Sequence, residues 1–220
     1  MSLFITNDGS HSIQSEQFDV SYHSRHGAIQ ETEHVFINAG LLYVPKTDQI
    51  NVLDVGFGTG LNAFATLLRV ADEYLAVRYH ALEAYPIDPS LASSLNYAER
   101  YNRPEHQNAF LAMHETKWNE TLEIVPRFLF CKEKVRFEAV ALRDQHYHVI
   151  YFDAFAPTAQ PELWDEHVLG KMYHALRPGG ILVTYCAKGS FKRCLKSLGF
   201  TVEAIPGPPG KREMTRAIRE

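Results

Sequence analysis

A glycine-rich turn between an apolar run and a helical pattern is the feature that most constrains the fold of this chain. Residues 51–62 read NVLDVGFGTGLN. The apolar run at 50–55 predicts a buried strand, and the apolar spacing over 61–70 predicts a helix. A strand that turns directly into a helix leaves the first backbone N–H groups of that helix unpaired at the carboxyl edge of a sheet. We therefore predict that a cofactor binds at this turn.

The spacing of the glycines narrows the chemistry of that cofactor. The three glycines follow a GxGxG pattern, whereas a dinucleotide pyrophosphate site needs GxGxxG. The shorter spacing suits an amino-acid carboxylate or an adenosine better than a pyrophosphate. A tight structural turn and a nicotinamide site are the alternatives. We predict cofactor contacts from Asp54, Gly56, Phe57, Gly58 and Gly60.

Two further carboxylates follow the next two predicted strands. The strand at 78–84 ends near Glu83, which can accept both hydroxyls of a ribose. The alternating run at 135–142 predicts a third strand, and Asp144 follows it at a position suited to an adenine amino group. An aspartate at a strand end is equally often a cap, so the role of Asp144 stays open.

A fourth predicted strand, 147–152, leads into a loop that begins with Asp153. At this edge of an open α/β sheet the second substrate meets the cofactor. The Asp153 carboxylate can hold an amine nucleophile and accept its proton, and Phe155 can flank a planar base. The alternative is that Asp153 caps the next helix and that Phe155 belongs to the core. We expect a core position for Trp164.

The order of the predicted elements defines the fold class. Strands alternate with helices from residue 50 onward, which indicates an α/β, Rossmann-like, mostly parallel sheet. Seven strands are predicted, and the last two, 200–205 and 213–218, pair antiparallel across a short turn. Residues 1–49 are predicted to form an N-terminal cap or extension on the main domain at 50–220, in one structural unit. Further helices are predicted at 89–101, 161–176 and 190–198, and 105–134 has few clear patterns.

Composition excludes several classes of protein. The three cysteines form no CxxC pair and the eleven histidines are scattered, so no metal site is predicted. The sequence contains no leader pattern and no long apolar run, which favours a cytoplasmic protein without a membrane association.

The charge is distributed unevenly along the chain. The net charge is −4, but residues 188–220 hold eight basic and three acidic side chains, a local charge of +5 that leaves −9 for residues 1–187. A basic lobe on an acidic body is what contacts to RNA phosphates need, and we predict such contacts from Lys211 and Arg212. The alternative is that these are ordinary solvated charges.

Two resemblances to known proteins follow from these motifs. The glycine turn with Glu83 and Asp144 resembles the cofactor site of class I S-adenosylmethionine-dependent methyltransferases. Four segments together resemble the methyltransferase part of the tRNA 5-methylaminomethyl-2-thiouridine enzymes, and the likeness runs from about Phe18 to Ala217. These segments are AIQETEHVF at 28–36, DVGFGTGLN at 54–62, DAFAP at 153–157 with PELW at 161–164, and GKREM at 210–214.

The second resemblance implies a specific reaction. Its substrate would be 5-aminomethyl-(2-thio)uridine at the wobble position of tRNA, bound through the anticodon stem-loop, with S-adenosylmethionine as the cofactor. Asp153 would lie closest to the chemistry, Glu83 would hold the ribose, and Glu31 would lie near the cofactor or the substrate amine. No metal is implied.

The chain departs from the bifunctional form of that family by ending at Glu220. We therefore expect only the final methylation, without a flavin-dependent oxidase domain, and separate enzymes that supply the aminomethyl precursor. One alternative function is a methyltransferase or aminopropyltransferase for a small amine. Another is a non-catalytic RNA-binding domain on the same fold. The glycine spacing disfavours a nicotinamide-dependent reductase.

Overall fold

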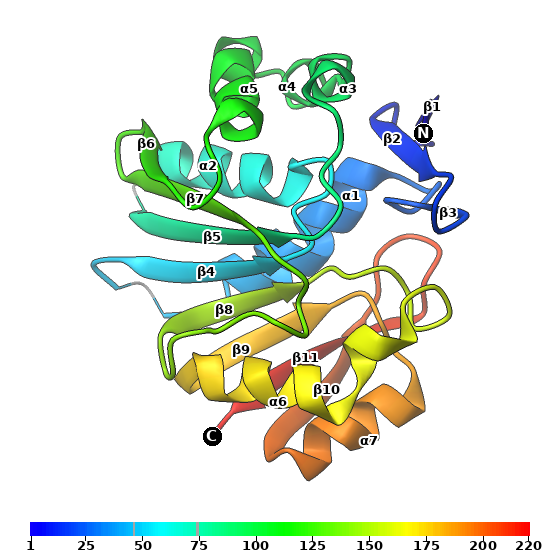
Figure 1. The fold of residues 1–220 in the computed structure, drawn as a ribbon, viewed down its shortest axis with the longest axis vertical. Coiled ribbons are helices and arrows are strands. Elements are labelled where there is room, and N and C mark those ends of the chain that lie inside the picture. The colour runs from blue at the N-terminus through cyan, green and yellow to red at the C-terminus, as the bar shows by residue number, and fades with distance from the viewer. Residues whose placement is uncertain (46, 74) are drawn as a thin grey trace.

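An eight-stranded sheet forms the centre of the molecule in the computed structural model, which describes residues 1–45, 47–73 and 75–220 (Figure 1). The strand order is β10-β11-β9-β8-β4-β5-β7-β6. The five strands from β9 to β7 in that order run parallel, while β10, β11 and β6 pair antiparallel with their neighbours. The predicted α/β fold with a C-terminal antiparallel pair is confirmed. The strands are β4 (Ile50–Val55), β5 (Val77–Glu83), β6 (Thr121–Val125), β7 (Phe128–Lys134), β8 (Tyr147–Phe152), β9 (Leu176–Thr184), β10 (Phe200–Pro206) and β11 (Glu213–Arg219).

Helices cover both faces of this sheet because successive strand residues point to opposite sides. Val52 packs with the helices of one face, whereas Leu53 packs with those of the other. Figure 1 shows α6 and α7 in front of the sheet and α1 and α2 behind it. The helices are α1 (Ala28–Thr32), α2 (Leu61–Glu73), α3 (Pro89–Ser93), α4 (Tyr97–Arg100), α5 (Gln107–Glu115), α6 (Glu166–Ala175) and α7 (Gly189–Ser197), with short 3₁₀ turns η2 (Pro104–His106) and η3 (Pro161–Trp164).

The N-terminal segment has two parts. Strands β1 (Ser2–Ile5), β2 (His11–Ser15) and β3 (Val20–Ser21) form a separate antiparallel sheet beside the main one (Figure 1). Helix α1 then continues into a π-helix, η1 (Glu33–Leu41), which packs against β8, β9 and α2. Gly40 permits this packing, since a Cβ there would lie 3.0 Å from a methyl group of Val183. The first 49 residues therefore contribute to the main core as well as to a cap.

The third parallel strand along the chain is β7, and the prediction of a strand at 135–142 is wrong. That segment is irregular chain, and its apolar pattern arises because Phe137 and Val140 are buried against the α6 face of the sheet. Strand β7 forms a hairpin with β6, in which Arg127 takes a positive φ of 72°. Strand β6 is the one beyond the predicted seven. The 105–134 segment thus supplies an edge hairpin and α5.

Two predicted helices are shorter than expected. The 89–101 pattern divides into α3 and α4, and the 161–176 pattern divides into η3 and α6. Asp165 separates the second pair: its backbone is extended and its side chain accepts a hydrogen bond from the Val168 N–H, which begins α6. No helix in the described ranges has the length and apolar character needed to cross a membrane.

Candidate active site

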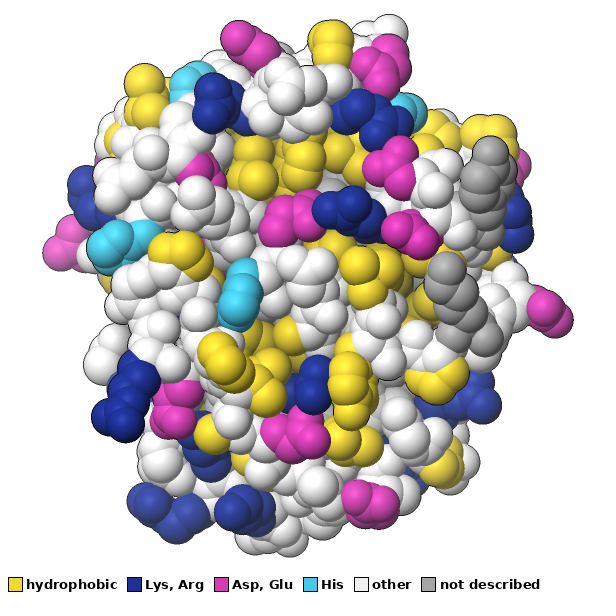
Figure 2. All heavy atoms as spheres, turned by 180° about the vertical axis from the view of Figure 1, so that it is seen from behind, with side chains coloured by type: hydrophobic (Ala, Val, Ile, Leu, Met, Phe, Trp, Pro, Cys, Tyr) yellow, Lys and Arg dark blue, Asp and Glu magenta, His cyan; other side chains and the backbone are white. Residues whose placement is uncertain are grey.

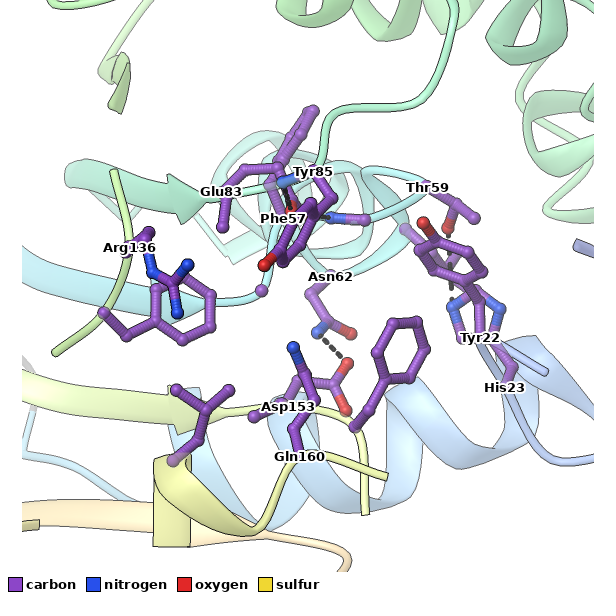
Figure 3. Close-up of a pocket in the computed structure, with 18 of the residues that line it drawn as sticks. Tyr22, His23, Phe57, Thr59, Asn62, Glu83, Tyr85, Arg136, Asp153 and Gln160 are labelled. Atoms are coloured by element: carbon purple, nitrogen blue, oxygen red, sulfur yellow. Dashed lines mark hydrogen bonds between the residues drawn. The ribbon is translucent and has the colours of Figure 1, made fainter. Parts of the chain in front are cut away.

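A hollow of about 720 Å³, partly open to solvent, lies at the carboxyl edge of the parallel strands (Figure 3). Its walls are the loops that follow β4, β5, β7 and β8, together with Tyr22 and His23 from the N-terminal segment. Loops after adjacent parallel strands meet at one edge, so residues far apart in the sequence share this hollow. The predicted site residues among its lining are Gly56, Phe57, Gly58, Glu83, Asp153 and Phe155.

The glycine turn is shaped by close packing as well as by room for a ligand. Gly56 has a φ of +106°, and a Cβ there would lie 2.9 Å from the backbone oxygen of Asp153. Gly60 has a φ of +77°, and its Cβ would lie 2.8 Å from Nε2 of His114, behind the hollow. Both positions need glycine for the conformation and for the contact. The turn is therefore held directly against the loop that carries Asp153.

Glu83 connects this turn to the end of β5. Its carboxylate accepts the Gly58 N–H at 2.8 Å and the Tyr85 N–H at 2.7 Å, one on each oxygen. Burial raises the pKa of Glu83. Each carboxylate oxygen has two lone pairs, so Glu83 can still accept hydroxyl donors from a molecule in the hollow.

Asp54 lies beneath the turn and is not part of the lining. It is fully buried, and its Oδ2 accepts the Tyr79 hydroxyl at 2.7 Å. Its Oδ1 has no hydrogen-bond partner within the described part of the chain. Burial is the main cause that raises the pKa of Asp54 to about 8. The structure thus places Asp54 as a buried support of the turn.

Asp153 and Asn62 meet across the hollow (Figure 3). Nδ2 of Asn62 donates to Oδ2 of Asp153 at 2.8 Å, while its Oδ1 accepts the Thr32 hydroxyl at 3.0 Å. The second bond fixes the orientation of the amide, so that the NH₂ group faces the carboxylate. Burial, followed by the charges of Glu31 and Asp54, raises the pKa of Asp153 well above its usual range. Asn62 was not predicted as a site residue, although it lies within the glycine motif.

Glu31 and Lys211 form an ion pair beside Asp153. Oε1 of Glu31 accepts from the Lys211 ammonium at 2.7 Å, and Oε2 accepts the Ser24 N–H at 2.9 Å. The Lys211 ammonium also lies 3.9 Å from the ring centroid of Tyr185, whose hydroxyl donates to the Ala154 carbonyl. Lys211, predicted to contact RNA, is therefore engaged by Glu31 and Tyr185, although neither it nor Glu31 lines the hollow.

Aromatic rings close the hollow toward the N-terminal cap. The Phe155 ring lies 5.1 Å from that of Phe18 and 5.0 Å from that of Tyr22, measured between centroids. Phe155 is half-buried and lines the hollow. Trp164 is buried, as predicted, and its indole N–H donates to the Phe155 carbonyl at 2.8 Å. Trp164 thereby fixes the backbone of the loop that carries Phe155.

Asp144 is a wrong prediction for the adenine position. It is exposed in the turn before β8 and lies next to α6, away from the hollow. The prediction failed because it depended on a strand at 135–142. The residues that follow β7 and line the hollow are Phe137 and Glu138, with Arg136. Placing the third strand at β7 would have identified them.

His23 is another lining residue that the motifs did not identify. Its Nδ1 lies 3.1 Å from the Ser12 hydroxyl and its Nε2 lies 3.4 Å from that of Thr59. Burial lowers the pKa of His23 to about 4, so the ring is neutral at neutral pH. It connects the N-terminal cap to the glycine turn without adding charge.

The fold and the hollow agree with a comparison against protein families. A profile of S-adenosyl-L-methionine-dependent methyltransferases matches residues 107–220, slightly more than half of the chain. The chain belongs to this family, and the predicted cofactor is confirmed. The residues present fit that molecule: Glu83 suits a ribose, Phe137 offers an apolar surface, and the positive φ values at Gly56 and Gly58 bring backbone to the ligand.

Individual relatives narrow the assignment. The chain is 28% identical over 219 residues to the tRNA 5-methylaminomethyl-2-thiouridine biosynthesis bifunctional protein MnmC of Methylobacillus flagellatus, covering 91% of this chain and 32% of that protein. It is 29% identical over 220 residues to the protein of the same description from Magnetococcus marinus, covering 92% and 31%. The crystal structure of MNMC2 from Aquifex aeolicus matches with a TM-score of 0.76 at 25% identity, covering 98% of this chain and 69% of that chain.

These matches confirm the resemblance to the methyltransferase part of the tRNA 5-methylaminomethyl-2-thiouridine enzymes. The chain spans about a third of the length of the curated relatives it matches.

Proposed function

We propose that this methyltransferase N-methylates 5-aminomethyl-(2-thio)uridine at the wobble position of tRNA, giving 5-methylaminomethyl-(2-thio)uridine. The observation that carries the proposal is the Asp153 carboxylate, held by Asn62 at 2.8 Å with Phe155 on the same loop. A carboxylate beside an aromatic ring suits a substrate that joins a cationic amine to a planar base. The relatives are tRNA 5-methylaminomethyl-2-thiouridine biosynthesis proteins, which supports this substrate.

Proton placement is the task of the Asp153 carboxylate. The substrate ammonium must lose one proton before its nitrogen lone pair can form the new N–C bond. Bound S-adenosylmethionine would supply the methyl group, whose bond to sulfur breaks and leaves its electron pair on the sulfur of S-adenosylhomocysteine. Asp153 accepts a hydrogen bond from the amine, which aims the lone pair, and its raised pKa makes it a suitable proton acceptor near neutral pH. The product is a secondary ammonium, so one proton is released overall.

Orientation of the amine depends on residues around Asp153. Asn62 occupies one carboxylate oxygen, which limits how the carboxylate can rotate. Trp164 and Tyr185 hold the backbone carbonyls of Phe155 and Ala154. A fixed acceptor contributes more to methyl transfer than acid strength does, because the nitrogen must lie in line with the carbon–sulfur bond.

The proposed macromolecular partner is the anticodon stem-loop of tRNA, in the cytoplasm. Bases in single-stranded loops can leave the stack and enter a pocket, where aromatic rings hold them. Phe155, which lines the hollow, is suitable for stacking on a uridine, and its contact with Phe18, 5.1 Å between ring centroids, fixes the position of its ring.

Methyl transfer to undermodified tRNA tests the proposal. The protein is incubated with labelled S-adenosylmethionine and tRNA from a strain that lacks the modification, and the tRNA is digested to nucleosides. We expect the label in 5-methylaminomethyl-(2-thio)uridine. Label in another nucleoside, transfer to small amines without transfer to tRNA, or tRNA binding without transfer would each contradict it.

Asp153→Asn is the matched variant for this assay. It preserves the size of the side chain and the Asn62 contact on oxygen, but it removes the proton acceptor. We expect turnover to fall by about 10²- to 10⁴-fold with little change in S-adenosylmethionine affinity. Undiminished turnover in Asp153→Asn would exclude the assigned role.

A further inference from the structure

Lys211 is held at its position by contacts on both sides of the loop between β10 and β11. Gly210 has a φ of +85°, and a Cβ there would lie 2.2 Å from the His26 ring. On the other side of the loop, Nε2 of His34 lies 2.8 Å from the Pro206 carbonyl oxygen. The loop is therefore packed closely on the segment that leads into α1, and this packing brings the Lys211 side chain to Glu31.

The ammonium of Lys211 is directed at groups within the protein. It lies 2.7 Å from a carboxylate oxygen of Glu31 and 3.9 Å from the Tyr185 ring centroid. Glu31 is buried, and the Lys211 side chain is 33% exposed. A lysine that contacts a phosphate needs its ammonium at the surface, where RNA can approach. This geometry instead assigns Lys211 to the neighbourhood of Asp153.

The negative charges of Glu31 and Asp153 act on each other, and the Lys211 ammonium offsets this repulsion. Like charges raise each other's pKa values, so with no cation present Glu31 and Asp153 would tend to retain a proton between them. Asp153 lines the hollow and is held by Asn62, whereas Glu31 is buried outside that lining and acts on Asp153 through its charge.

We propose that Lys211 is a positioning residue of the methyl-transfer site, which neutralises Glu31 so that the charge of Glu31 does not hold a proton on Asp153, the carboxylate that receives the substrate ammonium. The inference rests on the proposed function and specifies how that site recognises its substrate: one cationic amine, bound at one carboxylate.

Other charged and titratable groups around Asp153 raise or lower its pKa. The charges of Glu31 and Asp54 raise its pKa, and the charge of Lys211 lowers it. Asp153 in turn raises the pKa of two tyrosines. These groups belong to five parts of the chain: Glu31 on α1, Asp54 on β4, Tyr79 on β5, Tyr185 after β9 and Lys211 before β11.

Titration of the Asp153 carboxyl by NMR tests the inference without any substrate. Lys211→Met removes the cation and leaves Glu31 unpaired, so we expect the pKa of Asp153 to rise by about one unit. Glu31→Gln removes the neighbouring negative charge, so the pKa should fall. The double variant removes both charges and should return the pKa toward that of the wild type. An unchanged pKa in Lys211→Met would overturn the inference.

The pH profile of methyl transfer supplies the second readout. Because Asp153 must be ionised, the acidic limb of kcat/KM should move upward by the same unit in Lys211→Met, and activity below that limb should fall about tenfold. Lys211→Arg keeps the charge and should retain most of the activity. The double variant should recover part of it, which also shows that the lost activity of Lys211→Met does not come from misfolding.

Binding of tRNA distinguishes this role from a phosphate contact. We expect the affinity of Lys211→Met for tRNA, and its dependence on salt, to match the wild type. Weaker binding with a salt slope reduced by about one, together with an unchanged pH profile, would assign Lys211 to the RNA backbone instead. If the wild type transfers no methyl group to tRNA, the proposed function fails, while the Asp153 titration still decides the role of Lys211.

Discussion

Single carboxylates in this molecule have separate tasks that their surroundings impose. Asp54, Glu83 and Asp153 all lie at or next to the carboxyl ends of strands, at the same edge of the sheet. Burial is the largest cause acting on the pKa of each. Their partners differ: Asp54 has a tyrosine hydroxyl, Glu83 has two backbone N–H groups, and Asp153 has an amide. We therefore propose that the partner of each carboxylate, more than its burial, decides its role: Asp54 supports the turn, Glu83 holds the cofactor and Asp153 accepts the proton.

Replacing Glu83 by glutamine tests its role in holding the cofactor. A glutamine amide would direct an NH₂ group at one of the two backbone N–H donors, of Gly58 or Tyr85, and would lose the negative charge. We expect the Kd for S-adenosylmethionine, measured by calorimetry, to increase by about 10- to 100-fold. Glu99→Gln, at an exposed site on α4, is the control, and an equal loss in both variants would refute the role.

Asp54 makes the stability of the fold depend on pH. Its pKa rises from 3.8 to about 8 on folding, so between these values the folded chain holds a proton that the unfolded chain has lost. Folding then takes up a proton, and stability falls as the pH rises through this window. Asp54→Asn removes that dependence.

We expect the free energy of unfolding in urea of Asp54→Asn, relative to that of the wild type, to increase by at least about 1 kcal/mol as the pH rises from about 5 to about 8. The difference between the two proteins cancels the contributions of the buried histidines. A constant difference across this range would show that Asp54 is ionised in the folded protein.

At the scale of elements, the sequence predicts the apolar strands and the edge strand β10 close to their bounds, but it misses the interior strand β7. Strands β4 and β8 match the predicted ranges because they are continuous apolar runs, buried on both faces. Strand β7 carries Lys132, Glu133 and Lys134 and gives no such run. Apolar periodicity reports which side chains are buried, and loop residues such as Phe137 produce it without backbone pairing.

Some residues of the candidate site can likewise be predicted from the sequence, whereas their contacts with distant segments cannot. Residues at the ends of well-predicted strands, such as Glu83 and Asp153, were identified from position alone. The partner of Glu31 was not, because Lys211 lies 180 residues away and only the folded loop brings the two together. Contacts between distant segments require the three-dimensional arrangement, which local patterns do not contain.

The close approach of the β4 and β8 loops predicts a large effect for Gly56→Ala. A Cβ at Gly56 would meet the Asp153 carbonyl oxygen at 2.9 Å, in addition to the strain of its positive φ. Gly179 also has a positive φ, but a Cβ there would meet nothing within 4 Å. Gly179→Ala therefore isolates the backbone strain, with an expected cost of about 1–2 kcal/mol.

For Gly56→Ala we expect a loss of about 3 kcal/mol in chemical denaturation, with weaker binding of S-adenosylmethionine. The difference between the two losses of stability should thus equal the cost of the steric clash between a Cβ at Gly56 and the Asp153 carbonyl oxygen. Equal losses of stability would mean that the loop after β8 moves away from the turn at little cost.

For the whole molecule, the basic C-terminal region is neutralised in part by its own fold, because three of its eight basic side chains form ion pairs. Lys211 pairs with Glu31, Lys192 with Glu213, and Arg216 with Glu203. Lys and Arg side chains still gather at the end of the molecule that carries β10, β11 and α7 (Figure 2). The exposed basic residues of this region include Lys188, Arg193, Lys196 and Arg212. Glu203 and Glu213 are already counted in the net charge of +5, so of these three pairs only the one with Glu31 lowers the charge available to a polyanion.

Arg212 is the exposed cation next to Lys211, on the loop that reaches the site, and it is the residue through which we expect RNA phosphates to be contacted. Arg212→Ala should weaken tRNA binding and reduce the slope of log K against log salt by about one, because one phosphate contact releases about one counterion. S-adenosylmethionine affinity should not change. Arg78→Ala is the matched control, since Arg78 is an equally exposed arginine near the start of β5, at the opposite edge of the sheet. If both variants alter the slope equally, tRNA binds without preference for this face, and the position of Arg212 beside the site has no part in RNA recognition.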